Sequence, residues 1–395
     1  MFSCSVEKEI TEVLHKCMED KPITKTDCLL LLESEDTHSI LRSARLTRDR
    51  FKPGLITYSP KVFINLINLC RDTCSYCTYK KMPTDRDLSM LSREQALLIA
   101  QKGKMAGCTE ALIVTGERPE TRYLEAREWL QSLGHSSIID YIRDVSELIL
   151  QKTGLLPHTN AGSLTKKEMS SLKDTNVSLG VMLESASDRL VRKGMTHEMA
   201  PSKNPKVRIK TIQSAGELRI PMTTGLLVGL GETPEELIDS LFLLRNIQNK
   251  FGHLQEVIMQ NFSPKADTAM AMFDRPSHSY FVKCVALARL VLNDMNIQVP
   301  PNLNPGCLGD FLDAGINDWG GISPVTIDHV NPEYCWPDLE NLERITTQKA
   351  GDLRARLPIY PEFLDESLGF VSERLKPFID SLVDESGLVK EYSKN

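Results

Sequence analysis

Short apolar runs alternate with amphipathic stretches from residue 55 onward, and this alternation restricts the fold more than any other feature of the chain. Repeated βα units favour a parallel sheet with helices outside it, so the predicted class is α/β, as a TIM-like (β/α) barrel. An open doubly wound sheet is the alternative. Strands are predicted at 61–67, 110–115, 155–160, 177–184, 220–230, 254–262 and 297–300. Helices are predicted between them, at 92–106, 137–152, 165–174, 205–215, 234–250 and 278–295.

Helix start signals support this division of the chain. Ser92 with Gln95, and Thr165 with Glu168, have the spacing of a capping box, in which each side chain satisfies a free backbone N–H. Thr233 precedes a proline and two glutamates, which is typical of a capped helix with acidic residues in its first turn.

The two ends of the chain differ from this central pattern. Apolar residues such as Val6 and Ile10 recur at helical spacing, so residues 1–54 are expected to form a helical N-terminal extension. The barrel core is expected to span 55–330. Residues 331–395 are expected to form a C-terminal helical extension or cap.

Composition excludes several classes of partner. The chain is 41% hydrophobic and 25% charged, with a formal net charge of −6, so it lacks the basic footprint of a nucleic-acid-binding protein. No stretch approaches the roughly 20 apolar residues that span a bilayer, and the N-terminus lacks the apolar core of a secretory signal. Ten cysteines without a regular framework indicate a reducing compartment, so we expect a cytoplasmic protein.

Three cysteines directly follow the first predicted strand. Cys70, Cys74 and Cys77 have the spacing C-x3-C-x2-C. Thiolates are the usual ligands of iron–sulfur clusters, and one short loop can ligate three irons of a 4Fe-4S cluster and leave the fourth iron open to a substrate. A structural zinc site normally has four protein ligands, and the other cysteines are single and scattered. Zinc, or a cluster with a distant fourth ligand, is the alternative.

Further chemical groups follow the later strands, where the carboxyl ends of a barrel carry its chemistry. Residues 115–117, Thr-Gly-Glu, follow the second strand, Glu184 ends the fourth, and Arg208 begins the next helix. An ion pair at the barrel rim is the alternative interpretation of Glu184 and Arg208. Gly229 and Gly231 follow the fifth strand, where glycine allows close approach of the backbone to a ligand or only closes a βα corner.

Taken together, these motifs resemble radical S-adenosylmethionine (radical SAM) enzymes. In particular, they resemble subunit 1 of FO synthase, the 7,8-didemethyl-8-hydroxy-5-deazariboflavin synthase family. It covers roughly residues 55–350, and Tyr79 and the N-terminal 50 residues depart from the family pattern. The Asp-Trp-Gly-Gly run at 318–321 separates this family from general biotin-synthase-like relatives. The most specific matching segments are 57–63, 68–79, 114–120, 304–306 and 315–326.

The resemblance implies two cofactors, a 4Fe-4S cluster and S-adenosylmethionine (SAM). Cys70, Cys74 and Cys77 would be the three cluster ligands. The methionyl group of SAM would contact the Thr-Gly-Glu element, and its adenine would lie beside the glycine turn. The residues to which the resemblance thereby assigns cofactor binding are Tyr76, Gly116, Glu117, Glu184, Arg208, Gly229 and Gly231.

The reaction that the resemblance implies belongs to deazaflavin coenzyme biosynthesis. A radical SAM carbon–nitrogen lyase would convert 5-amino-5-(4-hydroxybenzyl)-6-(D-ribitylimino)-5,6-dihydrouracil and SAM to FO, 5′-deoxyadenosine, methionine and ammonia. Because the chain has one cysteine motif, it would catalyse only this cyclising half of FO synthesis. The implied partners are the tyrosine-derived adduct as substrate, a companion radical SAM subunit 2 that makes it, and an electron donor, with no nucleic acid or membrane.

Residues that contact the organic substrate are less well marked. Asp318 and Asn317 are expected in a glycine-rich loop at the eighth unit, where they could bind a uracil edge or ribityl chain, or form an Asx turn that supports the loop. His158, at the end of the third strand, is a candidate acid or base, although a hydrogen-bonded rim histidine is the preferred interpretation. The role of His329 is open.

Two other classes of function stay open on these motifs. One is another radical SAM barrel enzyme, such as a menaquinone-pathway cyclase or a biotin-synthase-like sulfur inserter. The other is a non-enzymatic protein that binds iron–sulfur or zinc. Production of 5′-deoxyadenosine from SAM would separate an enzyme from a binding scaffold.

Overall fold

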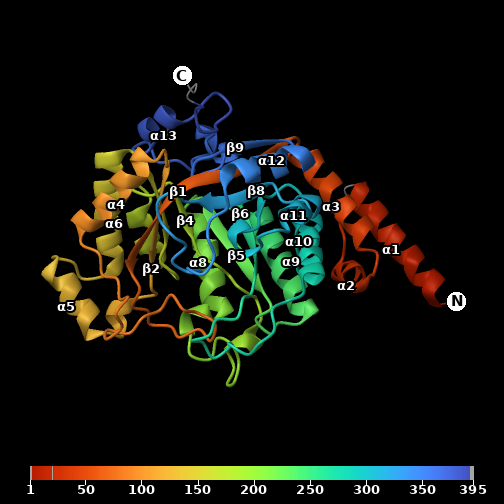
Figure 1. The fold of residues 1–395 in the computed structure, drawn as a ribbon, viewed down its shortest axis with the longest axis horizontal. Helices are drawn as coiled ribbons and strands as arrows, with labels where there is room; N and C mark the ends of the chain where they lie inside the picture. The colour runs from red at the N-terminus through yellow and green to blue at the C-terminus, as the bar shows by residue number, and fades with distance from the viewer. Residues whose placement is uncertain (1, 20, 392–395) are drawn as a thin grey trace.

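The computed structural model describes residues 2–19 and 21–391. Three helices precede the first strand and lie at one side of the molecule (Figure 1). They pack against two helices of the barrel's outer layer, α9 (Pro234–Phe251) and α10 (His278–Leu292). The N-terminal helices are α1 (Phe2–Met18), α2 (Lys25–Glu33) and α3 (Thr37–Phe51).

Eight parallel strands close into a barrel, which confirms the predicted fold class and excludes the open sheet. The first strand pairs with both the second and the eighth, so the sheet closes on itself. Helices surround the strands (Figure 1). The strands are β1 (Leu55–Ile67), β2 (Glu110–Thr115), β3 (Leu156–Asn160), β4 (Ser178–Gly180), β5 (Met222–Val228), β6 (Leu254–Asn261), β7 (Ile297–Gln298) and β8 (Asp318–Ile322).

The outer helices begin where the sequence places their caps. Capping boxes form at Ser92 with Gln95 and at Thr165 with Glu168, and Thr233 caps α9 with a proline in its first turn. The remaining helices of this layer are α4 (Arg93–Met105), α5 (Leu124–Ser132), α6 (Ile138–Thr153), α7 (Lys166–Leu172), α8 (Pro205–Glu217) and α11 (Leu308–Asp313). Short 3-10 helices lie at Pro119–Thr121, Asp188–Val191, Pro201–Lys203, Pro301–Leu303, Pro361–Phe363 and Glu366–Leu368.

Several predicted segments differ from the structure. β1 begins at Leu55 and not at residue 61, and β7 contains only Ile297–Gln298 of the expected 297–300. β4 contains only Ser178–Gly180 of the expected 177–184. The glycine-rich segment at 318–322 was expected to be a loop. In the structure it forms the eighth strand, with β7 and β1 on its two sides. Glycine weakens strands in isolation, so the segment carries little strand signal, and barrel closure supplies the pairing that its residues do not favour.

The C-terminal segment covers the end of the barrel where the strands begin. It contains α12 (Leu339–Lys349), β9 (Asp352–Ala355) and α13 (Lys376–Leu382). β9 pairs with the first residues of β1, and the apolar cluster after it includes Leu156, the first residue of β3. The segment lies along one edge of the molecule in Figure 1. It therefore closes the amino end of the barrel and leaves the carboxyl end to the loops. The expected boundaries at 54 and 330 stay predictions.

A buried polar network fills the base of the barrel beside this segment. The Arg356 guanidinium donates to both carboxylate oxygens of Asp318, at 2.6 and 2.9 Å, and to Glu256 at 3.1 Å. Thr57 donates to Asp318, and the Tyr360 hydroxyl donates to Glu256 at 3.1 Å. Every charged member has an opposite charge or a hydrogen-bond donor, as buried charges require.

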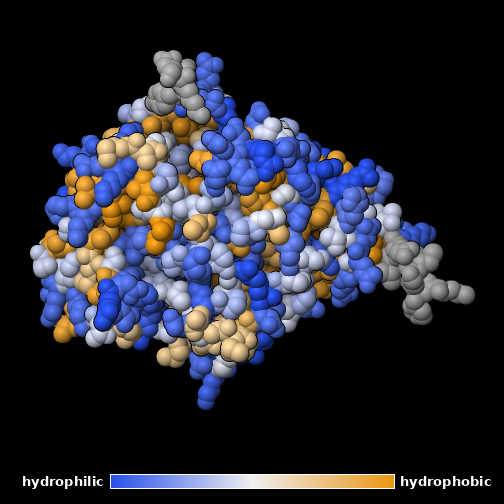
Figure 2. Space-filling model, viewed as in Figure 1, coloured by the Kyte–Doolittle hydropathy of each residue, from blue (hydrophilic) through white to orange (hydrophobic). Residues whose placement is uncertain are grey.

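Hydrophilic residues cover most of the face shown in Figure 2, with smaller hydrophobic patches between them. Within the described part of the chain, no helix is both long enough and apolar enough to cross a membrane.

Candidate active site

A cavity of about 310 Å³ lies at the carboxyl end of the barrel, the end where the sequence places its chemistry. Its two ends differ. The cysteine end contains the three cysteines together with Asp72, Glu117, Glu184, Lys203 and Arg208. The amide end contains Lys61, Gln260, Gln298 and Asn302. The cysteine end belongs mainly to the loops that follow β1 to β4, and the amide end to β1 and the last three units.

The cysteine loop is held by its backbone. The amides of Thr73 and Ser75 donate to carbonyls of the 196–199 segment, at 2.8 and 3.1 Å. The amide of Glu117 donates to the Cys70 sulfur at 3.2 Å. All three cysteines line the cavity, so their sulfurs are available to one bound group.

Gly116 explains how the loop after β2 comes so close to the cysteines. A Cβ atom at this position would lie 1.9 Å from the Leu69 carbonyl oxygen, so any larger residue would displace the cysteine loop. The Gly116 amide donates to the Ile67 carbonyl at 2.8 Å. The glycine of the Thr-Gly-Glu element therefore joins the two loops, and the glutamate that follows it enters the site.

The Glu117 carboxylate is buried and only partly paired. Its Oε2 accepts a hydrogen bond from the Ser163 amide at 2.9 Å and lies 3.6 Å from the Arg208 guanidinium. Its Oε1 has no hydrogen-bond partner, although Arg118 Nε lies 3.8 Å away. Because a buried polar atom without a partner is costly, Oε1 is a position where a ligand donor would be stabilised.

Glu184 lies across the cysteine end in a strained conformation. Its φ of 64° is in the left-handed region, which residues other than glycine rarely adopt. Backbone hydrogen bonds to Gly225 and Leu227 of β5 hold it there, at 2.9 and 3.1 Å. Its carboxylate forms an ion pair with Lys203 and not with Arg208, so the alternative interpretation of a Glu184–Arg208 pair is wrong. Arg208 instead donates to the Ser202 carbonyl at 2.7 Å and faces Glu117.

As the structure holds them, the three cysteine sulfurs do not have the spacing of ligands to a single metal ion. Tetrahedral zinc with Zn–S bonds of about 2.3 Å brings its sulfur ligands to within about 4 Å of one another. The cysteines do not form such a group: among the described residues, the three potential ligands whose donor atoms all lie within 4.8 Å are His278, Cys307 and Asp310. A polynuclear cluster separates its ligands more widely and fits this loop better. Burial raises the pKa of Cys70 to about 11, so ligation would displace its proton.

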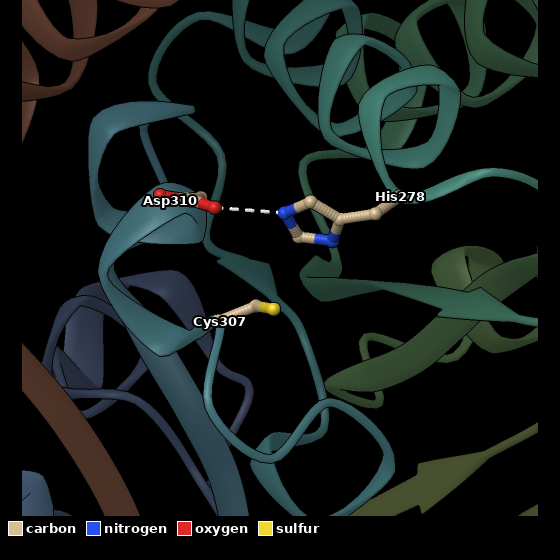
Figure 3. A group of neighbouring side chains, drawn as sticks. All are labelled: His278, Cys307 and Asp310. Atoms are coloured by element: carbon tan, nitrogen blue, oxygen red, sulfur yellow. Dashed lines mark hydrogen bonds and ion pairs between the residues drawn. The ribbon is translucent and has the colours of Figure 1, made fainter.

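Figure 3 shows the group of His278, Cys307 and Asp310. None of the three residues lines the cavity. His278 and Asp310 are exposed and form a hydrogen-bonded pair of 2.7 Å, drawn as the dashed line, and the Cys307 sulfur lies beside them. The pair joins the start of α10 to α11 and is explained as a surface contact.

Comparison with known proteins identifies the family. The Radical SAM superfamily matches residues 64–244. The 7,8-didemethyl-8-hydroxy-5-deazariboflavin synthase of Methanopyrus kandleri is 43% identical over 336 residues, which are 85% of this chain and all of that protein. The chain belongs to this family. The synthase of Methanocaldococcus jannaschii is 42% identical over 93% of the chain and all of its own length. FO synthase of Streptomyces coelicolor is 39% identical over 98% of the chain, which spans only 46% of that protein.

Solved structures agree with the barrel architecture. The FeFe-hydrogenase maturase HydG of Carboxydothermus hydrogenoformans has a TM-score of 0.74 at 18% identity, over 95% of this chain and 90% of that one. Methylornithine synthase has a TM-score of 0.67 at 19% identity, over 87% and 97% of the two chains. The fold and the family match make the chain a radical SAM enzyme of the deazariboflavin synthase family, and that superfamily uses an iron–sulfur cluster and SAM.

The family's expected cofactor residues lie mostly at one end of the cavity. Tyr76 lines it, and its hydroxyl lies 3.3 Å from His197 Nε2. Gly116, Glu117, Glu184 and Arg208 also line it, in addition to the cysteines. The turn of Gly229 and Gly231 is not part of the lining. Both glycines have positive φ, 100° and 97°, so they are explained by the turn that leads into α9.

Both candidate catalytic residues lie in buried hydrogen-bond networks away from the cavity lining. Asp318 does not lie in a loop over the cavity but begins β8, where it is fully buried in the network with Arg356. His158 lies in the middle of β3, is buried, and its Nδ1 lies 2.6 Å from the Ser178 hydroxyl. Neither lines the cavity. The Asn317 side chain is also engaged within the protein, because its Oδ1 accepts a hydrogen bond from the Arg289 guanidinium at 2.7 Å. His329 packs edge-on against Phe63.

Four charged residues of the cavity lining were not predicted from the sequence: Lys61, Asp72, Lys203 and Asp328. Lys203 precedes α8 without any motif. Asp72 is buried beside the cysteines with one oxygen unpaired. Lys61 is the charged residue of β1, and that charge was a usable signal, because a charge at an inward position of a barrel strand points into the interior.

Proposed function

We propose that this chain is the deazaflavin-forming subunit of FO synthesis. It would convert 5-amino-5-(4-hydroxybenzyl)-6-(D-ribitylimino)-5,6-dihydrouracil and SAM to FO, 5′-deoxyadenosine, methionine and ammonia. The observation that carries this proposal is the match to the whole length of the Methanopyrus kandleri synthase at 43% identity. The cavity supports it, because its cysteine end and its amide end offer separate sites for a cofactor and an organic substrate.

The cysteine end fits the two cofactors in its donor set. Cys70, Cys74 and Cys77 would ligate a 4Fe-4S cluster and leave one iron without a protein ligand. The unpaired Oε1 of Glu117 is suited to an ammonium group, and Arg208 beside it to a carboxylate, which together match the methionyl end of SAM. When bound, the cluster and SAM supply a hydrogen-abstracting organic radical.

The protein's own residues would position the reactants and keep water out. Glu184 is held rigidly by β5 and Lys203, so it can orient a ribose hydroxyl without reorganisation. Phe63, Tyr79 and Val114 form an apolar patch beside the cysteines that shields the reacting atoms. Tyr79 is itself fixed, since its hydroxyl donates to Asn65 at 2.6 Å.

The companion reaction would come from a second radical SAM unit. The chain matches less than half of the Streptomyces coelicolor FO synthase, and it carries one cysteine motif in one barrel. We infer that a second radical SAM subunit makes the tyrosine adduct, and that a separate reductant supplies electrons to the cluster.

The test is anaerobic reconstitution of the full chain with iron and sulfide, followed by reduction in the presence of SAM and the adduct. The expected result is a fluorescent deazaflavin with the mass of FO, formed together with 5′-deoxyadenosine. Cleavage of SAM without any deazaflavin would reject the proposal in favour of another radical SAM reaction.

A further inference from the structure

Lys61 is an amine in the cavity without an anionic partner. It lies on β1 opposite Glu110 of β2 and lines the cavity. Among the described residues, no salt bridge or hydrogen bond is formed by its ammonium. Its neighbours are aromatic: Nζ lies 5.7 Å from the centre of the Phe63 ring and 5.0 Å from that of Trp336. Cation–π contacts of this kind orient an ammonium group but do not replace an anion or a hydrogen-bond acceptor.

The nearby carboxylates are all occupied by other donors. Glu110 accepts from the Ser59 hydroxyl. Asp328 accepts from the side-chain amide of Asn302 at 3.0 Å and from that of Asn331 at 3.1 Å. Glu256 belongs to the Arg356 network at the barrel base. Lys61 is thus left to face the cavity, where its ammonium can donate to a bound group that is not part of the protein.

Three carboxamides line the same end of the cavity. No side-chain hydrogen bond is found for Gln260 or Gln298 among the described residues, and both line the cavity. The Asn302 amide nitrogen faces Asp328, which fixes its orientation, and its Oδ1 is buried without a partner. Together with Lys61, these groups offer both donors and acceptors but no negative charge of their own.

The ligand that matches this set is a flat lactam ring. Its carbonyl oxygens would accept from Lys61 and the glutamine amides, and its N–H groups would donate to the carboxamide oxygens. Phe63 and Trp336 supply apolar surface for the ring, and the Trp336 indole is fixed by a 2.8 Å hydrogen bond to the Thr326 carbonyl. A phenol ring has a single polar atom and would leave most of these groups without a partner.

We propose that Lys61, Gln260 and Gln298 bind the dihydrouracil ring of the substrate, with Lys61 donating a hydrogen bond to a ring carbonyl oxygen. This inference rests on the proposed function and deepens it. It places the pyrimidine half of the adduct at the amide end, and leaves the hydroxybenzyl half toward the cysteine end.

The test measures binding of the two halves of the substrate to reconstituted full-length protein. Ribityl-aminouracil is the probe for the pyrimidine half, and 4-methylphenol is the probe for the phenol half. Changing Lys61→Met is expected to weaken ribityl-aminouracil binding about 10- to 100-fold, the loss typical of a hydrogen bond to a charged group. Gln260→Leu should weaken ribityl-aminouracil binding about 2- to 10-fold. This variant tests the proposal if Lys61→Met does not fold. Lys102→Met, an exposed lysine on α4, is the matched control and should leave binding unchanged.

Other readouts exclude a general effect on the cavity. The KM for the adduct should rise in Lys61→Met, and Lys61→Arg should recover part of the affinity because it keeps a charged donor. Unchanged ribityl-aminouracil binding in both Lys61→Met and Gln260→Leu would overturn the inference. So would an equal loss of SAM affinity, or a selective loss of 4-methylphenol binding.

Failure of the inference is distinguishable from failure of the proposed function. If the unchanged protein forms FO but Lys61→Met binds ribityl-aminouracil normally, only the assignment of Lys61 is wrong. If the unchanged protein neither binds ribityl-aminouracil nor forms FO, both are wrong.

Discussion

The barrel has two polar interiors that differ in how their charges are satisfied. At the base, Asp318 and Glu256 share Arg356, and each has a further hydrogen-bond donor. At the mouth, Glu117 keeps an oxygen without a partner and Lys61 contacts only aromatic rings. The base combines strand residues with Arg356 from the C-terminal segment, and the mouth combines Lys61 of β1 with loop residues such as Glu117. A buried charge therefore indicates a ligand site only where no other group of the protein pairs with it.

The largest effect is expected at the cysteine end. Cys74→Ala removes one of three proposed cluster ligands, so reconstituted protein should lose its cluster and form no detectable 5′-deoxyadenosine. Folding should change little, because the cysteine makes no structural bond. Iron content and SAM cleavage are the measurements. The control is Cys108→Ala, a buried cysteine outside the cavity, and the comparison fails if the two variants lose iron alike.

At the base of the barrel, removing a buried charged side chain should lower the stability of the fold and leave the chemistry of the site unaffected. Arg356→Met leaves two buried carboxylates without their cation, and the free energy of unfolding should fall by about 3–5 kcal/mol. Arg354→Met is the control, since its partly exposed pair with Asp384 should contribute no more than about 1 kcal/mol. Urea unfolding measures both. If Arg356→Met has normal stability but no activity, the network of Arg356, Asp318 and Glu256 is part of the active site and not only of the fold.

His158 gives the base a dependence on pH. Burial lowers its pKa from 6.5 to about 4, so the folded state disfavours the proton that the unfolded state accepts. Its contribution to stability is complete above about pH 6.5 and is lost as the pH falls toward 4. Between pH 7 and pH 5 this loss is about 2 kcal/mol for the single group. Lowering the pH from 7 to 5 should therefore reduce the free energy of unfolding of His158→Gln by about 2 kcal/mol less than that of the unchanged protein.

The measurement for His158 is urea unfolding at both pH values. His197 and His253 shift in the same direction, so the informative quantity is the difference between His158→Gln and the unchanged protein. His15→Gln, at an exposed histidine, is the control. Equal pH dependence in all three proteins would show that His158 accepts a proton in the folded state.

The smallest expected effect is on cofactor affinity. Glu117→Gln keeps the shape of the side chain and removes its charge, so SAM should bind about 10- to 100-fold more weakly. Stability should change little, because the Ser163 amide still has an acceptor. Equilibrium binding of SAM to the reconstituted protein is the measurement, with the exposed Glu125→Gln as control. Normal SAM affinity would remove Glu117 from the cofactor site.

Sequence patterns predicted the fold and the cysteine end well because both depend on local features. Helix caps such as Thr165 with Glu168 act within one turn, and the Thr-Gly-Glu element and the cysteines follow strands directly. The position of Asp318 could not be predicted from local sequence patterns. Its setting in a glycine-rich run suggested a binding loop, but its partner Arg356 comes from beyond the barrel, 38 residues later in the chain.

The sequence alone determined the α/β barrel, the family and the three-cysteine motif, because periodicity and spacing are properties of short segments. Only the tertiary structure decided which buried charges are paired with each other and which face the cavity. Pairing depends on residues that are distant in the chain, such as Lys61 and Trp336, and barrel closure brings them together. The same closure turned a weak glycine-rich segment into β8 and separated Asp318 from the site.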